Sequence, residues 1–129
     1  MTPLSFATSL VSAFAASDAE AYFAHFDPDA TFLFHDTPGR LESRAAYEEL
    51  WAEWEREAGF RVLVCESTNQ RVQEYAETAV FSHDVHTVRQ IDGAEDEVFE
   101  RETIVLRRDG NTWTCVHEHL SPDPAHATT

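Results

Sequence analysis

Two histidines near the end of the chain are the residues whose type and spacing most clearly could do chemistry. His117 and His119 lie two residues apart in an alternating segment that follows an Asp109-Gly110 turn. Side chains two apart on a strand point to one face, and imidazoles can act as acid, base or metal ligand near neutral pH. We therefore expect the pair to line a pocket, provided that no bulge interrupts the strand after Trp113. The alternative is a pair of hydrogen-bonded core histidines that anchors the sheet or a dimer interface.

The two preceding strand-like segments carry further candidates. Arg101 and Thr103 share one face of the nearer segment, and Arg101 is the only basic residue that we expect inside the pocket. Its guanidinium could bind a carboxylate or an enolate oxygen through two hydrogen bonds, or it could pair with a neighbouring glutamate. Asp84 and His86 share one face of the other segment, which is either a pocket wall or a solvated surface.

Polar residues also follow the first strand-like segment. His35 and Asp36 would stand there at the mouth of the pocket. The Asp36 carboxylate is a candidate general base, although an aspartate before Thr37-Pro38 is also an ordinary turn residue.

A helix with an aromatic stripe would face the sheet. Tyr47, Trp51 and Trp54 recur at helical spacing, which is typical of a core-facing stripe. The same side chains could instead contact a flat, apolar ligand.

A metal site is an alternative use of the histidines. Three imidazole nitrogens and one carboxylate would suffice for zinc or another transition metal. The ligands would come from His35, His86, His117 and His119, with Asp36 or Asp84. We expect no other cofactor.

Composition excludes several classes of partner. The 129 residues carry a formal net charge of -15, and all nine basic residues are arginines. Such a surface repels nucleic acid and anionic membranes. The apolar N-terminal segment lacks the positive start of a signal peptide, and no run is long enough to span a membrane. We expect a cytoplasmic protein in which Cys65 and Cys115 are reduced.

The order of the predicted elements favours an α+β fold. Helices gather in the first half of the chain, and strands in the second half. The elements are helices 3–16, 19–25 and 43–58 and strands 30–34, 60–73, 78–91, 98–108 and 112–121. We expect one domain, 1–122, in which a strongly curved antiparallel sheet forms a cone around three N-terminal helices, and a flexible tail, 123–129.

This order and three local motifs resemble the nuclear transport factor 2-like superfamily, in its SnoaL-like and ketosteroid-isomerase-like branch. The motifs are residues 26–34 with Asp-Ala-Thr at 29–31, residues 39–47, and residues 101–121. The last stretch is also similar to the association domain of calcium/calmodulin-dependent kinase II, where the position of His86 corresponds to a pocket arginine. The isomerases have a general-base carboxylate near the position of Asp36, whereas Tyr22 and Asp84 fit poorly to their oxyanion hole.

The resemblance implies a small-molecule pocket in the cone and a homodimer formed through the outer face of the sheet. The leading hypothesis is a cofactor-independent isomerase, cyclase or dehydratase that moves a proton next to a carbonyl. In it His117, His119 or Asp36 would act as the base, and Arg101 or the second histidine would hold the oxyanion. The alternatives are a non-enzymatic association or ligand-sensing module and a histidine-ligated metal enzyme.

Overall fold

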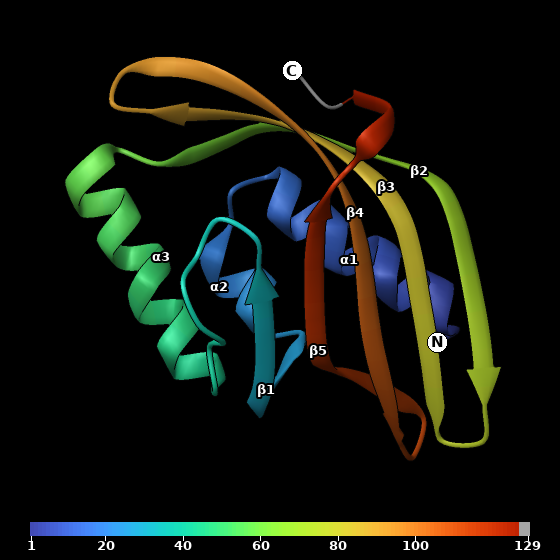
Figure 1. Cartoon of the computed structure of the whole chain (residues 1–129). Coiled ribbons are helices and arrows are strands. Elements are labelled where there is room, and N and C mark those ends of the chain that lie inside the picture. Colours follow the sequence, from blue (N-terminus) through green and yellow to red (C-terminus); the bar gives the residue numbers. More distant parts are fainter. Residues whose placement is uncertain (127–129) are drawn as a thin grey trace.

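Three helices pack in the hollow of one strongly curved, five-stranded sheet (Figure 1). The structure is a computed structural model that describes residues 1–126. Its elements are α1 (Pro3–Ala15), α2 (Ala19–Phe23), β1 (Phe26–Phe34), α3 (Arg44–Ala58), β2 (Arg61–Tyr75), β3 (Thr78–Ile91), β4 (Ala94–Asp109), β5 (Thr112–Pro122) and a 3-10 turn (Pro124–His126). The α+β cone expected from the sequence is confirmed.

Local capping signals set the ends of the helices. The side chain of Asp18 accepts a hydrogen bond from the backbone of α2, and that of Ser43 does the same for α3. Gly59 closes α3 with a left-handed backbone at φ 62°, which suits a residue without a Cβ. These signals lie within a few residues of the ends that they fix, so the sequence predicts α3 almost to the residue.

The sheet is mixed, whereas an antiparallel sheet was expected. Its strand order is β1-β5-β4-β3-β2, and β1 pairs with β5 in parallel. The other three pairings are antiparallel. Because α3 and three strands separate β1 from β5 along the chain, no hairpin forces the two strands to run in opposite directions.

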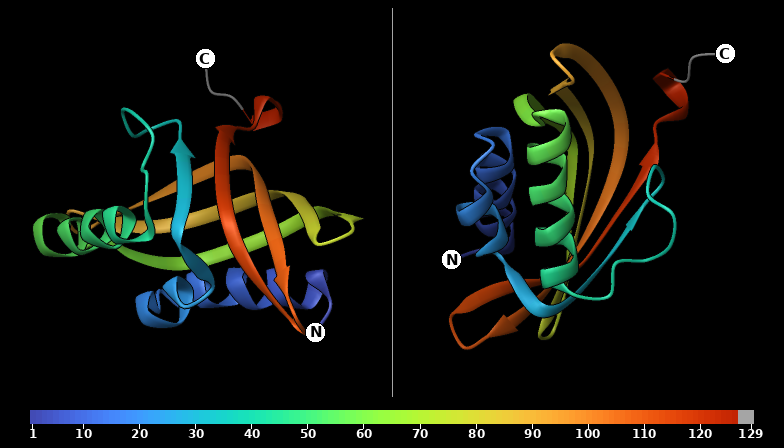
Figure 2. Two further views of the ribbon diagram at one scale, coloured as in Figure 1. Left: turned by 90° about the horizontal axis from the view of Figure 1, so that it is seen from below. Right: turned by 90° about the vertical axis from the view of Figure 1, so that its left-hand side faces the viewer.

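Curvature turns the sheet into a cone. The long β3–β4 hairpin arches over α3 (Figures 1 and 2), and the backbone N–H of Asp92 at its tip donates to Ala58 at the end of α3. Pairing shifts interrupt β2–β3 near Val64 and Asn69 and β4–β5 near Val116. Such bulges bend a strand and change which of its side chains face inward.

The narrow end of the cone is a packed aromatic core. Phe6, Phe26, Phe32, Phe81 and Trp113 are all buried there. Its aromatic rings meet mostly edge to face, an arrangement that adds to the stability gained from burial.

The last described turn, Pro124–His126, lies against the outer face of the sheet. The N–H of Asp123 donates to the carbonyl of Phe99, and the ring of His126 stacks on the ring of Phe99 at 4.2 Å. The rest of the predicted tail, 127–129, lies outside the described residues. Within the described part, no helix combines the length and apolar character needed to cross a membrane.

Candidate functional site

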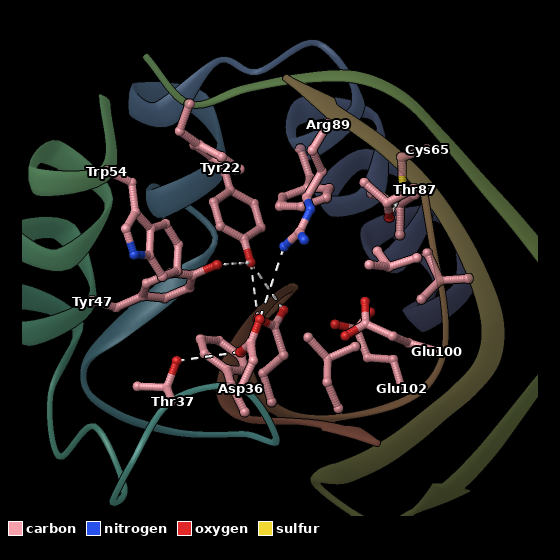
Figure 3. Close-up of a pocket in the computed structure, with 18 of the residues that line it drawn as sticks. Tyr22, Asp36, Thr37, Tyr47, Trp54, Cys65, Thr87, Arg89, Glu100 and Glu102 are labelled. Atoms are coloured by element: carbon pink, nitrogen blue, oxygen red, sulfur yellow. Dashed lines mark hydrogen bonds and ion pairs between the residues drawn. The ribbon is translucent and has the colours of Figure 1, made fainter. Parts of the chain in front are cut away.

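The wide end of the cone holds a cavity of about 340 Å³ between the helices and the sheet (Figure 3). Its walls are largely aromatic and aliphatic. The polar side chains among them are Tyr22, Asp36, Thr37, Tyr47, His83, Thr87, Arg89, Glu100, Glu102 and Glu118. Most of its carboxylates come from β4 and β5, while the tyrosines come from α2 and α3.

A buried carboxyl group meets two tyrosines inside the cavity. Glu118 is 1% exposed, and the hydroxyl of Tyr22 donates to its two carboxyl oxygens at 2.9 and 3.2 Å. The hydroxyls of Tyr22 and Tyr47 lie 3.2 Å apart and point toward each other in Figure 3. Burial, followed by the nearby charge of Glu118, raises the pKa of both tyrosines, so both hydroxyls stay protonated.

A second glutamate shares this buried environment. Glu102 lines the same cavity as Glu118, and one of its oxygens lies 2.7 Å from Nε2 of His83. Burial, followed by the charge of Glu100, raises the pKa of Glu102 to about 8. Burial and the charge of Glu102 raise the pKa of Glu118 well above its ordinary value. The pair therefore holds at least one proton at neutral pH.

Charged groups of opposite sign stand at the mouth. Arg89 binds Asp96 through two hydrogen bonds of 3.0 and 2.7 Å, and its guanidinium lies 3.9 Å from the carboxylate of Asp36. The ring of His35 lies 2.6 Å from Glu100. The positive charge of Arg89 is thus already paired within the protein.

Three of the predicted site residues line the cavity. Asp36 lies at its mouth, and Tyr47 and Trp54 form part of its wall. Trp51 lies behind that wall in ring contact with Tyr22 and Tyr47. Its indole N–H is buried without a hydrogen-bond partner among the described residues. Another predicted residue, His35, reaches the cavity wall only through its contact with Glu100.

The expected placement of the histidine pair is wrong, because β5 contains a bulge. Val105 pairs with His117 and Leu106 with Cys115, which leaves Val116 as an extra residue. The alternation therefore shifts by one after Cys115, and Glu118 faces the cavity. His117 binds Thr31 on the outer face, and the exposed His119 lines a shallow outer depression.

The faces expected for the two central strands are also reversed. Arg101 and Thr103 line the outer depression with Asp84, and His86 stacks on Phe99 at 4.4 Å, outside the cavity. Apolar residues occur on both faces of β4, so alternation alone did not identify the inner one. The fully buried Ile104 and Leu106 mark that face, and Glu100 and Glu102 share it.

Most of the polar cavity residues were not predicted from the sequence, namely His83, Arg89, Glu100, Glu102 and Glu118, and Tyr22 was set aside as a poor fit to an oxyanion hole. On β3 a signal was available, because Ala79 and Phe81 continue in alternation to His83. For Glu118 there was none, since only the bulge turns it inward. Buried glutamates are also contrary to the usual preference of that residue for the surface.

The predicted metal ligands do not converge. His117 and His119 have ring centroids 6.2 Å apart, while His35 and His86 are bound to glutamates elsewhere. In residues 1–126 no group of three or more histidine, cysteine, aspartate or glutamate side chains is arranged to hold a metal ion.

Solved structures share the fold across nearly the whole chain. A nuclear transport factor 2-like protein from Rhodospirillum rubrum is 17% identical with a TM-score of 0.81, covering 95% of this chain and 99% of that one. A ketosteroid isomerase-like protein from Erwinia carotovora atroseptica is 18% identical with a TM-score of 0.75, covering 92% of each chain. A candidate scytalone dehydratase from Novosphingobium aromaticivorans is 12% identical with a TM-score of 0.78, covering 93% of this chain and 80% of that one. At these identities the likeness shows the fold alone.

Sequence comparison identifies the family. No curated protein matches the chain, but residues 4–125 match the family model of the SnoaL-like domain. The match spans every helix and strand from α1 to β5. The chain therefore belongs to the SnoaL-like domain family.

Proposed function

We propose that this protein is an acid–base enzyme that moves a proton next to the carbonyl group of a small, uncharged and largely apolar molecule. The observation that carries the proposal is the Glu118 carboxyl group, which is buried in an aromatic cavity and hydrogen-bonded to Tyr22. A protonated carboxyl and a neutral tyrosine are hydrogen-bond donors for an oxygen on which negative charge develops. Ketosteroid isomerase uses this pair of groups as its oxyanion hole.

Asp36 is the proposed base. Its carboxylate stands at the mouth of the cavity, near Arg89, and is about half exposed. It would take the proton from the carbon next to the carbonyl, and the electron pair of that C–H bond would form the enolate. Tyr22 and Glu118 would stabilise the enolate oxygen. Return of that proton to another carbon completes an isomerisation. In a dehydration the enolate instead expels a hydroxyl from the next carbon, and Asp36 gives its proton to that hydroxyl, which departs as water.

The charges of the cavity favour an uncharged ligand. The cavity glutamates offer no positive charge to a carboxylate, and Arg89 cannot compensate because Asp96 already binds it. The volume of about 340 Å³ lies near the lower end for small-molecule sites. A ligand with one or two fused rings and one carbonyl oxygen matches this description. The homodimer and the cytoplasmic location expected from the sequence stay predictions.

The proposal can be tested with 2-naphthol, whose oxygen carries partial negative charge on a flat apolar ring and so mimics an enolate. We expect it to bind with a change in Trp54 fluorescence. Replacing Tyr22→Phe or Glu118→Gln should weaken binding about threefold to tenfold, since each change weakens or removes a hydrogen bond to a neutral oxygen worth roughly 0.5 to 1.5 kcal/mol.

Tyr75→Phe and Glu95→Gln are matched controls, because both side chains are exposed at the surface. They should leave the affinity unchanged. Equal affinities for wild type, Tyr22→Phe and Glu118→Gln would refute the assigned oxyanion site.

A further inference from the structure

A chain of hydrogen bonds leads from the buried carboxyl pair to the edge of the sheet. Nε2 of His83 lies 2.7 Å from Glu102, and its Nδ1 lies 2.6 Å from the hydroxyl oxygen of Ser67. The exposed side-chain amide of Gln70 donates to that same oxygen at 2.8 Å. The hydrogen bonds thus run from Glu102 to Gln70, and Glu102 lines the same cavity as Glu118, to which Tyr22 donates.

A bulge in β2 opens the sheet at this place. Thr68 pairs with Asp84 and Arg71 with Ser82, so no residue of β2 lies directly opposite His83. The strand turns there through Asn69, a non-glycine residue with a φ of 51°. Because β2 is an edge strand, the half-buried Ser67 and the exposed Gln70 of this bulge connect the side chain of His83 to solvent.

The two links between Glu102 and the strand edge, His83 and Ser67, can both give and receive a proton. The side chain of His83 is fully buried beside the ring of Phe81, and burial lowers its pKa to about 4 despite the nearby charge of Asp84. The ring is therefore neutral at pH 7, with one nitrogen that donates and one that accepts. The hydroxyl of Ser67 suits either tautomer, since it can donate to Nδ1 or accept from it.

We propose that His83 and Ser67 form a proton relay that connects the Glu102–Glu118 pair to solvent at the edge of β2. The relay rests on the proposed function, to which it adds a route for protons that avoids the mouth. The pair can then gain or lose its proton while a ligand fills the cavity. His83 does not contact the ligand in this scheme, so it acts through Glu102.

The proton movements balance along the chain. When Glu102 releases its proton, its O–H bond breaks and an N–H bond forms at Nε2 of His83, while the N–H bond at Nδ1 breaks and an O–H bond forms at Ser67. The original hydroxyl proton of Ser67 passes to water at the strand edge. Glu102 is left as a carboxylate and His83 as the other neutral tautomer, and the reverse sequence returns a proton.

Hydrogen–deuterium exchange of the buried carboxyl group tests the relay. The protein is saturated with 2-naphthol to close the mouth and mixed with D₂O, and the shift of the protonated-carboxyl infrared band is followed in time. The band is assigned by its change in Glu118→Gln and Glu102→Gln. Wild-type protein should exchange about as fast with 2-naphthol as without it.

Two variants interrupt the relay at different links. His83→Gln keeps a hydrogen bond to Glu102 but cannot switch tautomer, and Ser67→Ala removes the outer link. Both should slow exchange about tenfold or more in the saturated protein, where local opening must replace the relay. Ser82→Ala, a serine of β3 on the outer face, should leave the rate unchanged. If His83→Gln does not fold, Ser67→Ala decides alone.

The outcomes separate the relay from the proposed function. If 2-naphthol binds in a manner that depends on Tyr22, but neither relay variant slows exchange in the saturated protein, the relay is wrong and the proposed function stands. If 2-naphthol does not bind, or binds without needing Tyr22 and Glu118, the proposed function is wrong and the relay falls with it.

Discussion

Replacing Glu102 with glutamine should remove a large part of the pH dependence of folding. The pKa of Glu102 is raised from an ordinary value of 4.5 to about 8, first by burial and then by the charge of Glu100. A carboxyl whose pKa rises on folding is bound to a proton in the folded protein and ionised in the unfolded chain between these values. It therefore favours folding fully at low pH, and this contribution is lost as the pH rises from about 4.5 to about 8.

The magnitude follows from the shift. One proton difference changes the free energy of unfolding by about 1.4 kcal/mol per pH unit, so Glu102 should contribute a loss of about 2 to 3 kcal/mol between pH 6 and pH 8, beside any loss due to Glu118. Glu102→Gln keeps the size of the side chain and its hydrogen bond to His83, but it does not titrate. This variant should lose about 2 to 3 kcal/mol less than wild type over the same range and should be more stable than wild type above pH 8.

Urea unfolding at pH 6, 7 and 8, followed by the fluorescence of the buried Trp51, measures this difference. Glu95→Gln is the matched control, because it removes one negative charge at an exposed position of the same strand. A Glu102→Gln protein whose stability falls as steeply as that of wild type would refute the reasoning.

Three further predictions follow from the same geometry. Replacing His117→Gln or His119→Gln should leave 2-naphthol affinity unchanged, since both side chains lie outside the cavity; a loss of binding in titrations would contradict the assigned faces. His83→Gln should reduce the loss in the free energy of unfolding at acid pH. In wild type the lowered pKa of His83, about 4 in the folded protein, should cost up to about 3 kcal/mol as the pH falls from 6.5 to 4. An unchanged loss in urea unfolding of the variant would count against a buried neutral ring. The anion 2-naphthoate should bind at least about tenfold more weakly than 2-naphthol at pH 7, because burial would remove water from its carboxylate and the cavity glutamates offer no positive charge in return. Equal affinities by calorimetry would contradict the proposed preference for uncharged ligands.

The parts of the fold that local signals determine were predictable from the sequence. Ser43 and Gly59 lie at the ends of α3, and its aromatic stripe places Tyr47 and Trp54 toward the cavity. Asp36 was predictable as a mouth residue because it follows the end of the first strand. Each of these signals depends only on residues that lie within about one helical turn of it or at the end of the same strand.

The inner face of the sheet depended on features that no local pattern encodes. One extra residue, Val116, moves the histidine pair outward and turns Glu118 inward. A bulge forms through pairing with a distant strand, so the alternation of β5 alone could not reveal it. The cavity also contradicts the rule that glutamate stays at the surface, as residues at functional sites often do.

The crystal structure of the protein with bound 2-naphthol would test the central claim most directly. We expect the ring to lie between Trp54 and the sheet, with the naphthol oxygen within hydrogen-bond distance, about 2.5 to 3.0 Å, of both Tyr22 and Glu118. A ligand bound at the outer depression beside His119, or one whose oxygen points to the mouth, would contradict it.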